Sequence, residues 1–215
     1  MKRTFSLFLL IFLAGSISIA PAQVKKICMS AEHDSLLRAM HPERGTIEDF
    51  EMSLAAWKKS KPSLAKRNLS DIYRIPVVVH IIHSGGTIGS GDNISVAQIL
   101  SQIQVLNEDF RRKPGTRGFS TYPQSADTKI EFELAKRSPS GAATNGITRH
   151  DAALFGSPPF DKSLIESTIK PGTIWDPNQY FNIWVMQASG LYGYAQFPEA
   201  SGLQGFTCYG YGTFV

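Results

Sequence analysis

The sequence predicts an α/β fold in which a mixed, twisted sheet is backed by one long helix. Three stretches carry this prediction: an apolar run at residues 75–83, an amphipathic stretch at residues 95–112 and an alternating stretch at residues 127–137. A long helix between two strands favours a crossover connection, so we expect these two strands to be parallel neighbours.

The apolar run, Ile75 to His83, is rich in β-branched residues and predicts a strand that is buried on both faces. Pro76 stands at its start, where a missing N–H is tolerated. The odd spacing of His80 and His83 places their side chains on opposite faces of a strand. One metal ion cannot easily take both, so we interpret each as a core or strand-end histidine.

The amphipathic stretch predicts a helix that ends near Arg111 or Arg112, before Pro114. Ser95 and Gln98 form a capping box at its start. Three polar residues, Asn107 to Asp109, fall in its last turn, and we interpret them as an exposed helix end rather than a carboxylate cluster. The apolar stripe that should face the sheet has helical spacing and consists of Val96, Ile99, Leu100, Ile103, Leu106 and Phe110.

The alternating stretch, DTKIEFELAKR, predicts a strand with one solvated face. Its apolar residues at 130, 132 and 134 point one way, and Glu131 and Glu133 point the other. We interpret the two glutamates as solvated rather than as an acid–base pair, which would need a partner in a pocket. A short extended piece at residues 147–149 and a weak helix at residues 162–169 follow.

A buried, aromatic-rich strand is expected from Tyr180 to Met186. A turn at Ser189-Gly190 leads to a short aromatic strand, Gly193 to Phe197, which Pro198 ends. We call this short strand, predicted at Gly193 to Phe197, the border strand. It is expected to lie at the sheet border, where an extended polypeptide can dock.

The N-terminus has the pattern of a secretory signal peptide. Lys2 and Arg3 form a charged start, residues 5–14 form a short apolar run, and Ala20-Pro21-Ala22 is an A-x-A cleavage site. The run is short for a membrane span of about 20 residues. We therefore expect residues 1–22 to be removed, the chain to be secreted, and no membrane attachment after signal removal.

Residues 23–70 are predicted to be helical and basic, with helical spacing at Asp34 to Met40 and Ile47 to Lys59. The basic, turn-prone residues around Lys61 and Arg67 are a target for proteolysis. A removable pro-segment and a plain helical extension fit this pattern equally well. The net charge of +4 belongs to these N-terminal parts, since basic and acidic residues nearly balance over the folded part, 71–215. No basic stripe predicts nucleic-acid binding.

Several phrases of the folded part resemble the pappalysin family of metzincin zinc metalloproteases, in particular its secreted bacterial, ulilysin-like branch. They span residues 73–198, in the family's order: YRIPVVVHIIH, NISVAQILSQIQVLNEDFRR, ADTKIEFELA, GITR, YFNIWV and GYAQFP. The resemblance implies a metzincin-like N-terminal subdomain with an antiparallel edge strand that lines the substrate cleft. A polypeptide substrate would then pair with Gly193, Tyr194, Ala195, Gln196 and Phe197.

Cys28, followed by Glu32, resembles the pro-region cysteine that blocks the catalytic zinc in latent members of this family. A thiolate is a strong zinc ligand and would occupy the open coordination position. The flanking residues differ from those that the family more often shows, Arg before the cysteine and Gly after it, because this chain has Ile27 and Met29 there. A disulfide between Cys28 and Cys208 stays an alternative in an exported protein.

The zinc motif of the family, HExxHxxGxxH, does not occur in this sequence. None of the five histidines stands in HExxH: His33, His41, His80, His83 and His150. We therefore expect an incomplete N-terminal fragment of a secreted zinc metalloendopeptidase that is inactive by itself, so that enzymatic activity of this chain stays uncertain. Zinc is implied for the family, and a calcium requirement stays open. The alternative is a non-catalytic secreted peptide-binding protein that uses the border strand.

Overall fold

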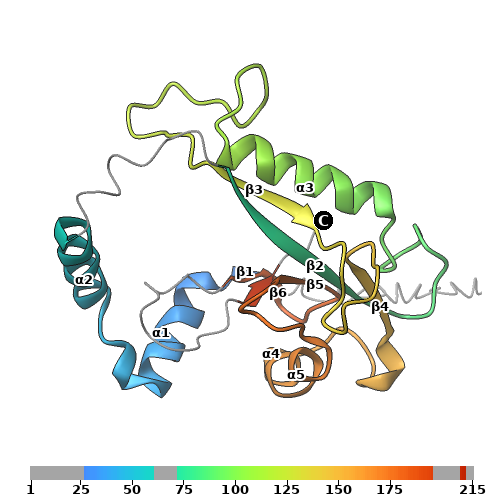
Figure 1. Ribbon diagram of the computed structural model, residues 1–215. Helices are drawn as coiled ribbons and strands as arrows, with labels where there is room; N and C mark the ends of the chain where they lie inside the picture. The colour runs from blue at the N-terminus through green and yellow to red at the C-terminus, as the bar shows by residue number, and fades with distance from the viewer. Residues whose placement is uncertain (1–26, 61–71, 196–208, 212–215) are drawn as a thin grey trace, which may run out of the picture.

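The computed structural model describes residues 27–60, 72–195 and 209–211 (Figure 1). The predicted signal peptide lies outside these residues. The centre of the fold is a twisted five-stranded sheet, in which β2 (Tyr73–His83) is the longest strand. The other strands are β3 (Ile130–Leu134), β4 (Ile147–Asp151), β5 (Phe181–Val185) and β7 (Tyr209–Tyr211).

The strand order is β3-β2-β5-β7, and β4 also pairs with β2. β3 pairs with residues 73–77 of β2 and β4 with residues 79–83, so these two short strands share one edge of β2 while β5 lies along the other. Every pairing between described strands is parallel. The α/β class and the parallel pairing of the first two strands are therefore confirmed.

Helix α3 (Val96–Phe110) covers one face of the sheet (Figure 1). The predicted capping box is present, because the side chains of Ser95 and Gln98 each bond the other's backbone N–H. Ile99 and Ile103 are buried against the residues of β2 that point to this face. The buried stripe is narrower than predicted, since Val96 and Leu100 are exposed.

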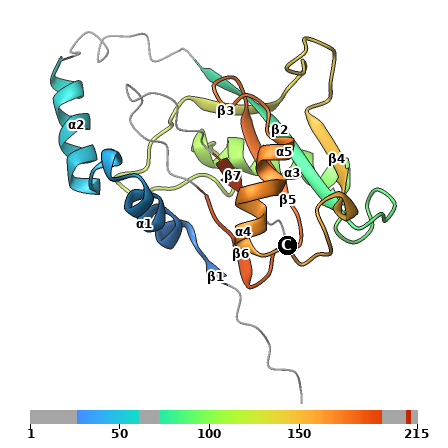
Figure 2. The same ribbon diagram turned by 90° about the horizontal axis from the view of Figure 1, so that it is seen from below.

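The opposite face carries one continuous helical segment, which the view from below shows in front of the sheet (Figure 2). It consists of α4 (Lys162–Leu164), the π-helical turn η4 (Ile165–Ile169) and α5 (Lys170–Thr173). Pro171 lies in the first turn of α5 and has no N–H to donate, a local reason for irregular helix geometry here. The segment extends beyond the helix predicted at residues 162–169 and packs Ile165 and Ile169 against the sheet.

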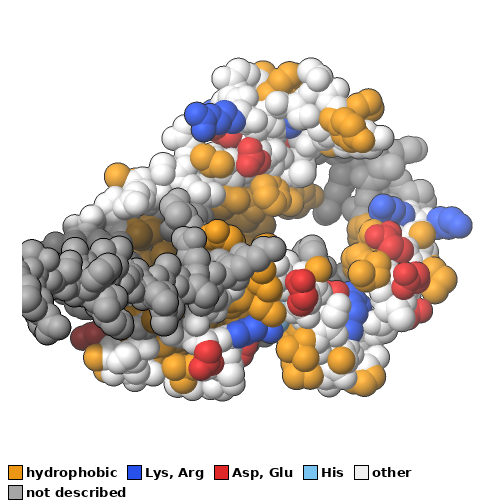
Figure 3. Space-filling view, turned by 180° about the vertical axis from the view of Figure 1, so that it is seen from behind, with side chains coloured by type: hydrophobic (Ala, Val, Ile, Leu, Met, Phe, Trp, Pro, Cys, Tyr) orange, Lys and Arg blue, Asp and Glu red, His pale blue; other side chains and the backbone are white. Residues whose placement is uncertain are grey.

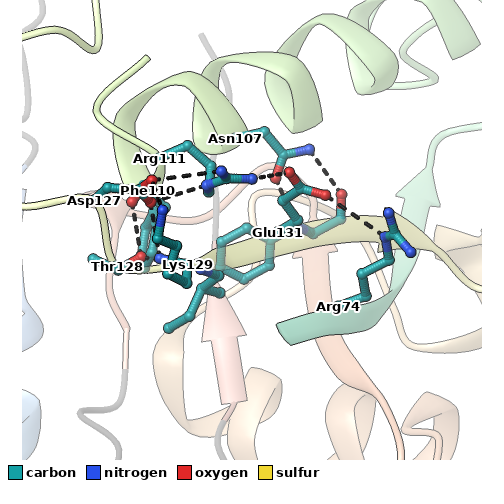
Figure 4. A network of polar contacts seen from close by, with 10 residues as sticks. Arg74, Asn107, Phe110, Arg111, Asp127, Thr128, Lys129 and Glu131 are labelled. Carbon is teal, nitrogen blue, oxygen red and sulfur yellow. Dashed lines mark hydrogen bonds and ion pairs between the residues drawn. The ribbon is translucent and has the colours of Figure 1, made fainter. Parts of the chain in front are cut away.

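Asn107, at the end of α3, holds the outer edge of the sheet (Figure 4). Its Nδ2 donates to the Phe132 carbonyl at 2.9 Å, and its Oδ1 accepts from the Phe132 N–H at 2.6 Å. The prediction of an exposed helix end was therefore wrong for Asn107. An amide side chain is suited to this position because it satisfies one donor and one acceptor of an edge strand at once.

Glu131 was expected to be solvated, and this was also wrong. Its carboxylate accepts a hydrogen bond from Arg111, whose Nε donates to Asp127 at 2.9 Å (Figure 4). Asp127 is also paired with Lys129 at 2.8 Å. An open cleft of about 590 Å³ lies beside these groups, between α3 and the loop that follows it. Glu133 remains more exposed and lies 3.6 Å from Lys136 Nζ.

The N-terminal segment, residues 27–60, contains β1 (Ile27–Cys28), α1 (Ser30–Met40), the short 3-10 helix η1 (Pro42–Arg44) and α2 (Ile47–Ser60). The two predicted helices are thus confirmed. α2 buries no residue, and a hollow lies between α2 and the sheet body in the space-filling view (Figure 3). Among the described helices, none has the length and apolar character needed to cross a membrane.

Candidate functional site

The border strand is occupied by the N-terminal segment of the same chain. Strand β6 (Leu191–Gly193) pairs with β1 in parallel, with Ile27 opposite Leu191 and Cys28 opposite Gly193. The Ile27 N–H donates to the Gly190 carbonyl at 3.2 Å, and the Met29 N–H donates to the Gly193 carbonyl at 3.1 Å. The border backbone therefore accepts an extended segment as a neighbouring strand.

The strand itself differs from the predicted Gly193 to Phe197. It begins two residues earlier, directly after the predicted turn, where Gly190 has a φ of 68° that favours glycine. Within the described residues it pairs only with β1, so the antiparallel edge strand of the main sheet is not found there. Gln196 and Phe197 lie outside the described residues, and their predicted substrate contacts stay predictions.

Ala195 and Tyr194 have opposite surroundings. Ala195 is exposed, and its N–H donates to Ser30 Oγ at 2.9 Å, which adds a third link between the border and the N-terminal segment. The Tyr194 side chain is only 3% exposed and lies in the core beneath the border. Its hydroxyl donates to the Glu166 carboxylate, and burial, with this carboxylate, raises the pKa of Tyr194.

Lys170 is a buried residue that bonds the same carboxylate as Tyr194. It is 1% exposed, and its Nζ donates to Glu166 Oε1 at 2.6 Å. The same Nζ lies 5.2 Å from the centre of the Tyr194 ring and 5.6 Å from that of Trp184. Burial lowers the pKa of Lys170 to about 7. Sequence reasoning missed this pair; its only signal was the i, i+4 spacing of opposite charges within an expected helix.

His33 of α1 lies against Tyr194. It is 2% exposed, and the centres of the two rings are 4.8 Å apart in an edge-on arrangement. Burial, together with the charge of Lys162, lowers the pKa of His33 to about 4. No local sequence pattern selects this histidine, because its contact joins residues that lie far apart along the chain.

Cys28 is exposed, and its Sγ lies 3.9 Å from Ser30 Oγ. Cys208 lies outside the described residues, so the alternative of a disulfide stays a prediction. Among the residues that the structure describes, no group of three or more His, Cys, Asp or Glu side chains is arranged to hold a metal ion. The described residues thus do not fit a catalytic zinc site, and Cys28 stays a predicted latency ligand only.

His80 is a satisfied core histidine, as predicted. It is fully buried, stacks on Trp184 at 5.1 Å between ring centres, and its Nε2 lies 2.9 Å from Asn182 Oδ1. Because Asn182 Nδ2 donates to two carbonyls, its Oδ1 accepts from His80 Nε2–H. The Thr148 hydroxyl then donates to Nδ1 at 2.7 Å, and burial lowers the pKa of His80 to about 4.

His83 is confirmed as a strand-end residue. Its Nδ1 accepts from the N–H of Gly85 at 3.1 Å. The two histidines of β2 therefore have separate structural partners, as their spacing predicts.

Comparisons with known proteins connect the chain to one group of solved structures. No protein-family model matches the chain, and no curated protein matches it. A mutant of promirolysin from Tannerella forsythia is 32% identical, over 82% of this chain and 54% of that chain, with a TM-score of 0.54.

Two further structures match over less of the chain. Mature mirolysin from the same organism, in complex with a cleaved peptide, is 39% identical over 60% of this chain and 48% of that chain, with a TM-score of 0.49. Mirolysin in complex with a molecule named compound 9 is 40% identical over the same shares, with a TM-score of 0.49. The chain spans about half the length of the solved proteins that it matches.

Proposed function

We propose that this chain is the N-terminal part of a secreted zinc metalloendopeptidase of the pappalysin type, and that residues 23–70 are its pro-segment. The ordered phrases of residues 73–198 support this family. The similarity to promirolysin supports it independently, because it extends over 82% of the chain and includes a form named as a proprotein. The A-x-A pattern ending at Ala22 supports export.

The single observation that carries the proposed role is the pairing of Ile27–Cys28 with Leu191–Gly193. Strand addition at an exposed edge is a common way to bind an extended peptide. An occupant taken from the chain itself uses the same backbone groups that a substrate would use. The pro-segment would therefore keep a polypeptide substrate away from the border until it is removed.

The proposed role of Cys28 follows from its register. It lies opposite Gly193, at the border that the substrate would occupy, and its thiol is exposed. As a thiolate it would serve as a latency ligand toward zinc held by residues outside the described part. The described residues account for peptide docking and its blockade, and for no bond-breaking step.

A second candidate is a secreted peptide-binding protein without catalytic activity. The occupied border favours it as well, since binding an extended segment needs only the backbone of residues 190–195. The two functions differ in what should follow Val215 in the gene. A coding sequence that continues with HExxHxxGxxH supports the metallopeptidase, whereas a stop codon directly after Val215 contradicts it and leaves the peptide-binding role.

The blocked border is tested by a disulfide trap in the whole chain, with Cys208 replaced by serine. Gly193→Cys should form a disulfide with Cys28 under mild oxidation, because the two positions are paired in register. Tyr192→Cys is the matched control, because the register shifts between the Ile27–Leu191 and Cys28–Gly193 pairs and leaves Tyr192 without a paired residue in β1. Intact-mass measurement and peptide mapping report the bond. Equal cross-linking of both variants, or of neither, contradicts the docked register.

A further inference from the structure

The His33 imidazole is inserted into a cluster of side chains beneath the border strand. We define the Tyr194 cluster as Tyr194 with three residues of the helical segment on the same face of the sheet: Lys162, Glu166 and Lys170. His33 meets the edge of the Tyr194 ring, and the ammonium groups of Lys162 and Lys170 lie 5.4 Å and 5.2 Å from the centre of that ring. His33 thus connects the N-terminal segment to the side chains that lie beneath β6.

The charges around His33 favour its neutral form. Two cations, Lys162 and Lys170, lie close enough to disfavour a protonated imidazole, and Glu166 and Asp34 act in the opposite sense. Both carboxylates already have cationic partners: Glu166 accepts from Lys170 at 2.6 Å, and Asp34 accepts from Arg38 Nε at 2.8 Å. Among the described residues, the surroundings of His33 therefore offer an imidazolium more repulsion than attraction.

We propose that the Tyr194 cluster is a docking site for the neutral imidazole of His33, and that protonation of His33 releases the pro-segment from the border strand. This inference rests on the proposed function, because it concerns the occupant of the same border. Release would begin in α1, which packs on Tyr194. Movement of α1 would then break the backbone hydrogen bonds of residues 27–29 and the Ser30–Ala195 hydrogen bond, because these bonds depend on the position of α1.

The direction of the pH dependence follows from linkage. The pKa of His33 is lowered from 6.5 to about 4 in the docked state, chiefly by burial. Docking is therefore unpenalised above 6.5, weakens as the pH falls from 6.5 to about 4, and changes no further below that range. Each unit in this range should weaken docking by about tenfold, or roughly 30-fold between pH 7.5 and pH 5. The lowered pKa of Lys170, about 7, affects a higher pH range.

Hydrogen exchange of the whole chain, followed by mass spectrometry and corrected for the intrinsic exchange rate, measures this release. Peptides that contain the amides of Ile27, Met29 and Ala195 should be protected at pH 7.5. Their protection should fall roughly 30-fold at pH 5. Amides of β2 and β5 report unfolding of the sheet in the same sample, and their protection should stay unchanged at pH 5.

Two variants separate protonation of His33 from other effects. His33→Gln should dock independently of pH between 7.5 and 5, because it carries no group that titrates there. Lys162→Gln removes one repelling cation, so the pKa of docked His33 should lie nearer 6.5 and the loss of protection between pH 7.5 and pH 5 should be smaller than in the unmodified chain. This second variant tests the inference even if glutamine fits the cluster poorly. His41→Gln is the control: His41 lies beyond the end of α1, is partly exposed, and should leave the release unchanged.

The outcomes also separate this inference from the proposed function. Absence of protection at Met29 and Ala195 already at pH 7.5 means that the border is not occupied, which contradicts both. Protection at pH 7.5 that persists at pH 5 in the unmodified chain overturns only the inference about His33. The same holds if His33→Gln loses protection at pH 5 as the unmodified chain does. Loss in the unmodified chain and His41→Gln, but not in His33→Gln, supports it.

Discussion

Asn107 and Phe132 are joined by two hydrogen bonds, one to each backbone polar group of Phe132, and this pair closes the outer edge of the sheet. The pair connects the end of α3 to the middle of β3. Without it, the edge strand would expose an unpaired N–H and carbonyl at its centre.

Asn107→Ala should therefore destabilise the chain by about 1–3 kcal/mol, because two half-buried backbone groups lose their partners. The midpoint of urea unfolding, read from tryptophan fluorescence, measures the change. Gln104→Ala is the control on the same helix, since the exposed Gln104 side chain donates to Glu108 of the same helix. A loss for Asn107→Ala no larger than that of the control contradicts the role of this pair.

Asp127 should make stability depend on pH. Hydrogen bonds from Arg111 and then Lys129 hold the pKa of Asp127 well below its usual value of 3.8. The ionised group therefore stabilises the fold above 3.8, and this contribution is lost as the pH falls through the folded-state value. Asp127→Asn should be less stable than the unmodified chain at neutral pH, with the difference shrinking below pH 3.8. Urea unfolding series at several pH values measure the difference, and Asp109→Asn, exposed at the end of α3, is the control carboxyl in the same series.

Thr148→Val tests the buried polar network around His80. The change keeps the shape of the side chain but removes the hydroxyl that donates to His80 Nδ1 and accepts from His150. Leaving the buried ring nitrogen without its partner should lower the free energy of unfolding by about 1–3 kcal/mol, which thermal and urea unfolding would detect. Thr87→Val, in an exposed loop, serves as the control. Equal stability of the two variants would show that the network contributes little.

Ser30→Ala tests the polar link between the N-terminal segment and the border. The Ala195 N–H loses its acceptor, so its protection from hydrogen exchange should fall about fivefold, as expected for loss of one hydrogen bond of about 1 kcal/mol. Ser53→Ala is the matched control, because its exposed hydroxyl donates to the Phe50 carbonyl within α2. Protection that is unaffected at Ala195 would contradict the link.

The 215-residue chain should not cleave a casein-type substrate and should bind no catalytic zinc tightly, because HExxHxxGxxH is absent from its sequence. A fluorescent casein assay with added zinc, combined with metal analysis of the purified chain, checks this expectation. Cleavage that a chelator abolishes would overturn it.

The sequence predicts the parts of this fold in which local pattern and tertiary role agree. β2 has a continuous β-branched run, and all of its residues from Val77 to Ile82 are buried. The capping box at Ser95 sets the start of α3 without help from distant residues. The parallel pairing of β2 and β3 follows from the length of the crossover between them.

The candidate site depends on contacts that leave no local pattern. Docking of β1 on β6 joins residues about 165 positions apart, and a two-residue strand has no periodicity to detect. The border strand begins two residues earlier than predicted. The aromatic residues suggested a strand from Gly193 onward, but the Tyr194 side chain lies in the core. Asn107 and Glu131 have polar side chains at positions that look solvated until their partners are known.

The arrangement of three strands around β2 also determines when the chain can fold. Residues 130–151 pair with one edge of β2. The other edge pairs with β5, which follows β2 by about a hundred residues along the chain. During synthesis, the buried residues of β2, Val77 to Ile82, therefore leave the ribosome long before the last partner of that strand exists. Such long-range pairing makes folding slow and leaves an aggregation-prone edge open in the meantime.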